Sequence, residues 1–141
     1  PIQYITKISH FYSRVLHISK GVLIPRPETE ILVEKVLEVF AKKKNISCLD
    51  MCSGSGCIGI SIALINPSLN VYGSDRSADS LNVALINKNN LNVDNFSLVH
   101  ADWLSSFKKE SFDLIVSNPP YIADQDPHLE NLKLVIRNYL I

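Results

Sequence analysis

A glycine-rich turn lies between a predicted strand and a predicted helix, at residues 49–59. Gly54, Gly56 and Gly59 follow the spacing G-x-G-x-x-G, and Asp75 comes about twenty residues after the turn. Glycines at such a junction allow tight backbone angles and the close approach of a ligand, while the acid can accept hydrogen bonds from ribose hydroxyls. The pattern therefore predicts a nucleotide-containing cofactor. By itself it does not distinguish among the several enzyme classes that share this geometry.

Asp50 ends the strand that leads into the turn. A carboxylate at this point would attract a cationic sulfonium and an α-ammonium group, whereas it would repel a pyrophosphate. Asp50 thus favours S-adenosylmethionine over a nicotinamide dinucleotide and is predicted to help bind it. A nicotinamide oxidoreductase is a remote alternative, because no catalytic tyrosine–lysine pair follows the loop in a recognisable spacing.

The most specific motif is Asn118-Pro119-Pro120-Tyr121, which follows the strand predicted at residues 112–117. Ligands of open α/β sheets bind beyond the carboxyl ends of the strands, which is where this motif falls. An amide nitrogen is a poor nucleophile, so it must be held by both N–H groups with its lone pair aimed at the methyl donor. The side-chain oxygen of Asn118 and the carbonyl of Pro119 can accept those two N–H groups, and the paired prolines stiffen the backbone.

Tyr121 can lie flat against a planar substrate, which would contribute about 0.5–1.5 kcal/mol. The sulfonium is already a good leaving group, so the main contribution of the protein is alignment. We therefore predict Asn118, Pro119 and Tyr121 as catalytic residues, and all four residues of the motif, Pro120 included, as substrate contacts.

Alternating strands and helices place these motifs at one edge of a sheet. The sequence predicts strands at residues 46–51, 69–74, 96–100 and 112–117, with helices at residues 56–65 and 78–89 between them. Repeated β-α-β units with right-handed crossovers give a parallel sheet of the doubly wound α/β class. A further helix is predicted to begin near Pro27, where Glu28 and Glu30 suit the positive end of its macrodipole.

Residues 1–24 are predicted to form a small β-hairpin and linker, because short β-like runs at residues 2–5 and 15–18 flank the aromatic pair Phe11-Tyr12. Residues 25–141 are predicted to form the cofactor-binding domain.

Composition excludes some classes of partner and site. Hydrophobic residues make up 46% of the chain and the formal net charge is zero, so bulk attraction of nucleic acid is not built in and no direct nucleic-acid binding is expected. No apolar run reaches membrane-spanning length. Cys48, Cys52 and Cys57 lack zinc or disulfide spacing, so we predict no metal site and expect reduced thiols in a cytoplasmic protein.

These motifs resemble those of the release factor glutamine N(5)-methyltransferases, the HemK or PrmC family, over nearly the whole chain. The most discriminating stretch is Leu-Ile-Pro-Arg-Pro-Glu-Thr-Glu at residues 23–30, because nucleic-acid adenine methyltransferases share Asn-Pro-Pro-Tyr but generally lack it. The segments that carry the likeness are residues 1–6, 23–30, 50–56, 75, 102–103, 118–121 and 126–129.

The resemblance implies a Rossmann-like, class I S-adenosylmethionine-dependent methyltransferase fold. It also implies methylation of the glutamine in a Gly-Gly-Gln motif of class 1 peptide chain release factors, which are then the expected protein partners. Trp103 would pack near the adenine, and Asn118 would touch both cofactor and substrate. The implied cofactor-binding residues are Asp50, Cys52, Ser53, Gly54, Ser55, Gly56, Asp75, Asp102, Trp103 and Asn118.

The chain departs from the family pattern in three places. Lys7 and Cys52 stand where the family usually has glycine, and residues 137–140 do not continue its usual pattern. If Cys52 requires a positive φ, the substitution costs on the order of 1–3 kcal/mol. The resemblance further implies an N-terminal helical domain and three more sheet strands. The chain is therefore expected to be a fragment, with the strand at residues 112–117 left as an exposed edge.

Two other functions remain open. An adenine N(6) nucleic-acid methyltransferase would also present a planar amine to the Asn-Pro-Pro-Tyr motif, although a basic stripe is lacking. A non-catalytic remnant is the third possibility, since the pattern breaks down after Leu129.

Overall fold

The computed structural model describes residues 1–119 and the backbone of residues 136–140. Its centre is a five-stranded parallel sheet in the order β5-β4-β3-β6-β7. The chain adds strands outward from β3 in one direction and then returns to add β6 and β7 on the other side, so the order reverses between β3 and β6. The strands are β3 (Ser47–Met51), β4 (Asn70–Asp75), β5 (Phe96–His100), β6 (Phe112–Ser117) and β7 (Ile136–Leu140).

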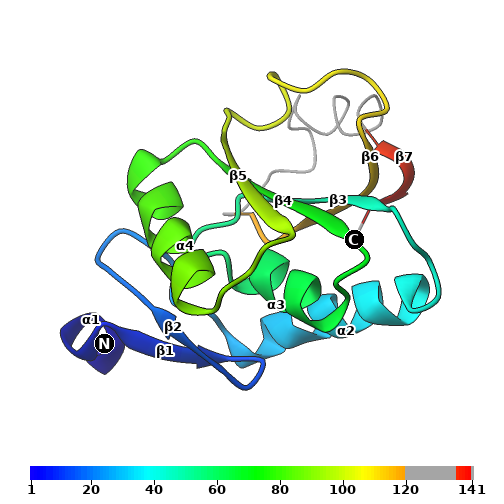
Figure 1. Cartoon of the computed structure of the whole chain (residues 1–141). Coiled ribbons are helices and arrows are strands. Elements are labelled where there is room, and N and C mark those ends of the chain that lie inside the picture. The colour runs from blue at the N-terminus through cyan, green and yellow to red at the C-terminus, as the bar shows by residue number, and fades with distance from the viewer. Residues whose placement is uncertain (120–135, 141) are drawn as a thin grey trace.

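Three helices cover one face of this sheet (Figure 1). They are α2 (Glu30–Phe40), α3 (Cys57–Ile65) and α4 (Ala78–Asn90). The sequence of α3 is apolar on almost every side because this helix lies against the sheet and also contacts both α2 and α4. Its first seven residues are buried, so the turn before it has a rigid support.

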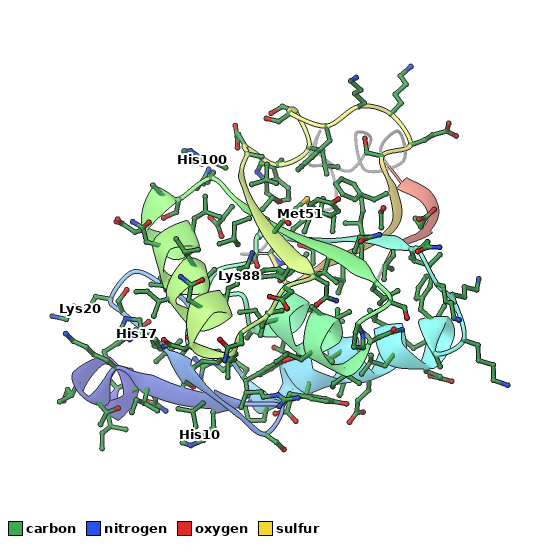
Figure 2. The ribbon with its side chains drawn as sticks, in the orientation of Figure 1. His10, His17, Lys20, Met51, Lys88 and His100 are labelled. Carbon is green, nitrogen blue, oxygen red and sulfur yellow. The ribbon has the colours of Figure 1, made fainter. Side chains whose placement is uncertain are left out.

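The opposite face of the sheet has a thinner cover. Residues 101–111 arch over it on the side away from the helices (Figure 1), and Met51 lies on this side of the sheet (Figure 2). Leu104 and Phe112 join Met51 in a buried cluster. Phe107 packs edge-on against Phe112 with 5.1 Å between ring centroids. A short irregular segment thus seals this face with aromatic contacts.

A short helix and a hairpin come before the sheet. They are α1 (Ile2–Thr6), β1 (Ile8–Phe11) and β2 (Arg14–His17). The predicted hairpin is confirmed, but the prediction of β structure at residues 2–5 is wrong, since these residues form α1. Lys7 caps the end of this helix with φ 59°, in the left-handed region that glycine adopts most readily. The division of the chain at residue 24 stays a prediction, although Phe11 and Leu16 pack into the same core as α2 and α3.

The predicted strands and helices of the sheet are confirmed, with ends that differ by at most one residue. The helix predicted near Pro27 begins as a 3-10 turn, η1 (Pro27–Thr29), which leads into α2. The expectation that β6 forms an exposed edge is wrong, because β7 pairs with it in parallel. The predicted contacts Pro120 and Tyr121, and the family segment at residues 126–129, lie outside the described residues.

Candidate functional site

A cavity of about 790 Å³ lies at the carboxyl ends of β3, β4 and β6. This is the position where the strand order reverses, and such crevices are the usual ligand sites of open α/β sheets. The volume falls within the roughly 300–1,000 Å³ of small-molecule sites. The predicted site residues on its wall are Cys52, Gly54, Asp75, Trp103, Asn118 and Pro119.

The glycine turn forms one side of this cavity. Gly56 caps α3 with φ 82°, and a Cβ atom there would lie 2.9 Å from Cδ1 of Ile60. Gly54 has φ 56°, so both glycines occupy the left-handed region that other residues seldom adopt. Cys52 has φ 61°. The positive φ considered for Cys52 is therefore confirmed, and this position carries strain on the order of 1–3 kcal/mol.

Asp75 is oriented by two backbone donors. The N–H of Gly54 donates to Oδ2 of Asp75 over 2.9 Å, and the N–H of Ser77 donates to Oδ1 over 2.9 Å. Each carboxylate oxygen retains a further lone pair. Because Asp75 lies on the cavity wall, these lone pairs can accept hydrogen bonds from the hydroxyls of a ligand.

Asp50 lies beneath the turn and does not line the cavity. It is 1% exposed, and its Oδ2 accepts from Oγ of Ser53 over 2.8 Å and from the N–H of Gly59 over 2.9 Å. Oδ1 is buried without a hydrogen-bond partner among the described residues. Burial raises the pKa of Asp50 to about 7, although the bonds from Ser53 and Gly59 lower it. This geometry makes Asp50 a support for the turn, and its predicted contact with a cofactor stays a prediction.

The other predicted loop residues also shape the turn from inside. Ser53 donates its N–H to the carbonyl of Ser74 over 2.9 Å, and the carbonyl of Ser55 accepts from Nδ2 of Asn87 over 2.9 Å. Ser53, Ser55 and Gly56 are buried and do not line the cavity. Asp102 is exposed and also does not line it. Ligand contact by these four residues stays a prediction.

Trp103 contributes an aromatic wall. Its side chain is half-buried and packs against the cluster on the thinner face of the sheet. Met51, Ala101 and Leu23 line the cavity as well. Together they provide an apolar surface against which a planar base could pack.

Asn118 follows β6, beside the point where the strand order reverses. Its Nδ2 donates to Oγ1 of Thr29 over 3.3 Å. Beside it, Oγ of Ser117 donates to the carbonyl of Met51 over 2.8 Å, which ties the ends of β6 and β3 together. Asn118 and Pro119 therefore follow directly after a strand end that this hydrogen bond holds in place.

Sequence reasoning missed several wall residues. Arg26, Glu28 and Thr29 of the proline–acid segment line the cavity, as do Arg76 and Ser77 beyond β4. From the sequence, the proline–acid segment is a family signature and a helix start, and neither feature assigns it to the site. Its stiff Pro25 and Pro27 were the available signal that this backbone holds a fixed position.

The three thiols are free and none is activated. Burial and the carboxylates of Asp75 and Asp50 raise the pKa of Cys52 to about 11, and burial raises the pKa of Cys57 to about 12. These cysteines are neutral near pH 7 and unsuited to nucleophilic catalysis. Within residues 1–119 and 136–140, we find no helix long and apolar enough to cross a membrane.

Residues 27–138 match the family model of the methyltransferase small domain. The chain is 38% identical over 133 residues to the release factor glutamine methyltransferase of Coxiella burnetii, covering 94% of this chain and 48% of that protein. It is 44% identical over 129 residues to that of Clostridium acetobutylicum, covering 89% and 45%. The chain thus spans about half the length of these curated relatives.

Among solved structures, the chain is similar to the Pyrococcus abyssi tRNA (uracil-54, C5)-methyltransferase in complex with S-adenosyl-L-homocysteine. The TM-score is 0.67 at 26% identity, covering 88% of this chain and 30% of that one. The sheet order, the cavity where that order reverses and the matched family model all indicate the same fold. The chain belongs to the methyltransferase small domain family and has the Rossmann-like fold of S-adenosylmethionine-dependent methyltransferases.

Proposed function

We propose that the protein transfers a methyl group from S-adenosylmethionine to the side-chain amide of a glutamine in a peptide chain release factor. The observation that carries the proposal is the shared cavity. It brings Asp75, Trp103 and Asn118 together from three separate strand ends. Two relatives that are 38% and 44% identical bear the name of this activity, which supports the same substrate class.

The residues on the wall fit the proposed cofactor. Asp75 offers free carboxylate lone pairs for ribose hydroxyls, and each such charge-assisted bond is worth about 1.5–3 kcal/mol. Trp103 and Met51 offer an apolar surface for the adenine. Gly54 brings backbone rather than a side chain to the cavity. The set combines a hydroxyl acceptor, a flat apolar wall and an accessible backbone, as an adenosine moiety requires.

S-adenosylmethionine supplies a methyl group on a positively charged sulfur, so the transfer needs little acid–base help. The task of the chain is to present the substrate nitrogen. Asn118 can accept one substrate N–H with its Oδ1, and the carbonyl of Pro119 can accept the other. Holding both N–H groups turns the nitrogen lone pair toward the methyl group, and such alignment can be worth about 7–11 kcal/mol.

The proline–acid segment supports a protein substrate. Arg26 and Glu28 are exposed and line the cavity. They place one positive and one negative group beside Asn118, where the backbone of a bound peptide could be held. The Gly-Gly-Gln motif of class 1 release factors is the proposed target, and the reducing cytoplasm, which suits three free cysteines, is the proposed compartment.

The decisive assay incubates the purified full-length protein with labelled S-adenosylmethionine and a class 1 release factor. A second release factor, with alanine in place of the motif glutamine, is the control. We expect label in the first factor and none in the second. Label in DNA or RNA with none in protein would overturn the proposal in favour of adenine methylation. Absence of label from every acceptor would overturn it in favour of a non-catalytic protein.

A further inference from the structure

Asn118 and Thr29 are 89 residues apart in the sequence, and both line the cavity. We propose that Thr29 is a positioning residue that holds the side-chain amide of Asn118 in place at the wall of the cavity. The inference rests on the proposed function, because it takes Asn118 as the group that holds the substrate amide.

A primary amide side chain has one acceptor end and one donor end. Nδ2 of Asn118 donates to Oγ1 of Thr29 over 3.3 Å. With its nitrogen engaged in this way, Asn118 keeps Oδ1 for the cavity. The reverse orientation would aim an NH₂ group at the substrate nitrogen, whose hydrogens are also donors. Two donors would then face each other, and the substrate could not be held.

Within the described residues, Thr29 is the group that restrains the side chain of Asn118. The residue is exposed, and its bond to Thr29 is the side-chain hydrogen bond that the described structure gives it. A rotation of the terminal amide is a soft motion. The hydroxyl of Thr29 therefore supplies a restraint that the exposed side chain otherwise lacks.

Thr29 itself is well held. It is 8% exposed and is the last residue of η1, and its N–H donates to the carbonyl of Arg26 over 3.0 Å. The next residue, Glu30, accepts from the N–H of Tyr12 over 2.8 Å, which ties this turn to the hairpin. Both partners of the Thr29–Asn118 bond thus stand on a backbone fixed by other contacts.

Four variants of the protein separate this role from simple structural support. Thr29→Val keeps the branched shape and removes the hydroxyl, whereas Thr29→Ser keeps the hydroxyl. Asn118→Ala removes the group that Thr29 is proposed to orient. Ser61→Ala is the matched control, since it removes another buried hydroxyl, one that donates to the carbonyl of Cys57 within α3.

The first measurement does not depend on activity. In the nitrogen-labelled chain of 141 residues, the side-chain NH₂ resonances of Asn118 are assigned by their loss in Asn118→Asp. We expect Thr29→Val to shift these resonances, and Thr29→Ser and Ser61→Ala to leave them in place. Unchanged resonances in Thr29→Val would overturn the proposal, even if the wild-type protein methylates no release factor.

The second measurement is steady-state methylation of the release factor by the full-length protein. We expect Thr29→Val to lower kcat about tenfold, the effect of losing one hydrogen bond, with little change in the KM for S-adenosylmethionine. Thr29→Ser should restore most of kcat. In the Asn118→Ala background, Thr29→Val should cause no further loss, because the two residues act as one unit. An equal loss in both backgrounds would assign Thr29 a purely structural role and overturn the proposal. Inactivity of the wild-type protein, in contrast, would refute the proposed function and leave the resonance measurement to decide on Thr29.

Discussion

Asp50 and Asp75 lie at the carboxyl ends of neighbouring strands of the same sheet, yet their surroundings differ sharply. Asp50 is 1% exposed, and its hydrogen-bond donors are Ser53 in the turn above it and Gly59 in the first turn of α3. Asp75 lies on the cavity wall with free lone pairs on both oxygens. One carboxylate builds the turn, and the other is available to a ligand.

The difference shows that two residues of the same type in one motif can have different roles. The glycine turn passes between these acids, with Gly59 bonded to Asp50 on its buried side and Gly54 bonded to Asp75 on its cavity side. Tight packing on the buried side fixes the turn, so that the cavity side can present backbone to a cofactor. Changes on the buried side and on the cavity side of the turn should therefore have different effects on stability and on binding.

The largest expected effect concerns the pH dependence of stability. Burial raises the pKa of Asp50 from 3.8 to about 7, so the folded state favours its protonated form. Its contribution to stability is complete below about pH 4 and is lost as the pH rises through about 7, which amounts to at most about 4 kcal/mol. Urea unfolding across this range should show a steeper decline for the wild-type chain than for Asp50→Asn.

Asp94→Asn removes an exposed carboxylate and serves as the control for this comparison. It should follow the wild-type profile. If Asp50→Asn does so too, the carboxyl group of Asp50 is solvated and does not belong to the buried side of the turn.

A smaller effect distinguishes Gly54 in the turn from Gly59 in α3. A Cβ at Gly59 would lie 2.5 Å from Cε2 of Phe96, whereas a Cβ at Gly54 would meet only Cγ1 of Val22, at 4.0 Å. We expect Gly59→Ala to lower the free energy of unfolding by about 2–3 kcal/mol through overpacking. Gly54→Ala should lower it by about 1 kcal/mol, through its φ of 56° alone. Equal losses in chemical unfolding would remove the distinction between the two sides.

The smallest effect concerns Cys52, whose φ is 61°. Cys52→Gly and Cys52→Ala both remove the sulfur, but only glycine relieves the left-handed strain. The glycine variant should therefore be more stable than the alanine variant by about 1 kcal/mol in thermal or urea unfolding. A more stable alanine variant would show that the turn relaxes to a negative φ.

The sheet was largely predictable from the sequence because its signals are local and repeated. The strands at residues 96–100 and 112–117 match the structure at both ends, since each is a short apolar run bounded by polar residues. Helix α1 was not predicted, because the β-branched isoleucines of residues 2–5 favour a strand and none of its residues is buried. Strand β7 was not predicted, because Arg137 and Asn138 interrupt its apolar residues.

The site was predictable in its parts but not in its arrangement. Residue type and spacing identified Asp75 and Asn118, and the family resemblance implied Trp103. All three line the cavity. The burial of Asp50 depends on the turn and α3 packing against it, and no local pattern records that. The contact of Thr29 with Asn118 likewise depends on the folded path of the chain, because the sequence places them far apart.

The most direct test of this account is calorimetric titration of the chain with S-adenosylhomocysteine, comparing Asp75→Ala with Asp50→Asn in folded protein. We predict saturable binding by the wild-type chain and a rise in Kd of at least about 100-fold in Asp75→Ala, from the loss of charge-assisted bonds to ribose. Asp50→Asn should change Kd far less. Normal binding by Asp75→Ala, together with abolished binding by a folded Asp50→Asn, would contradict the account by reversing the roles of the two acids.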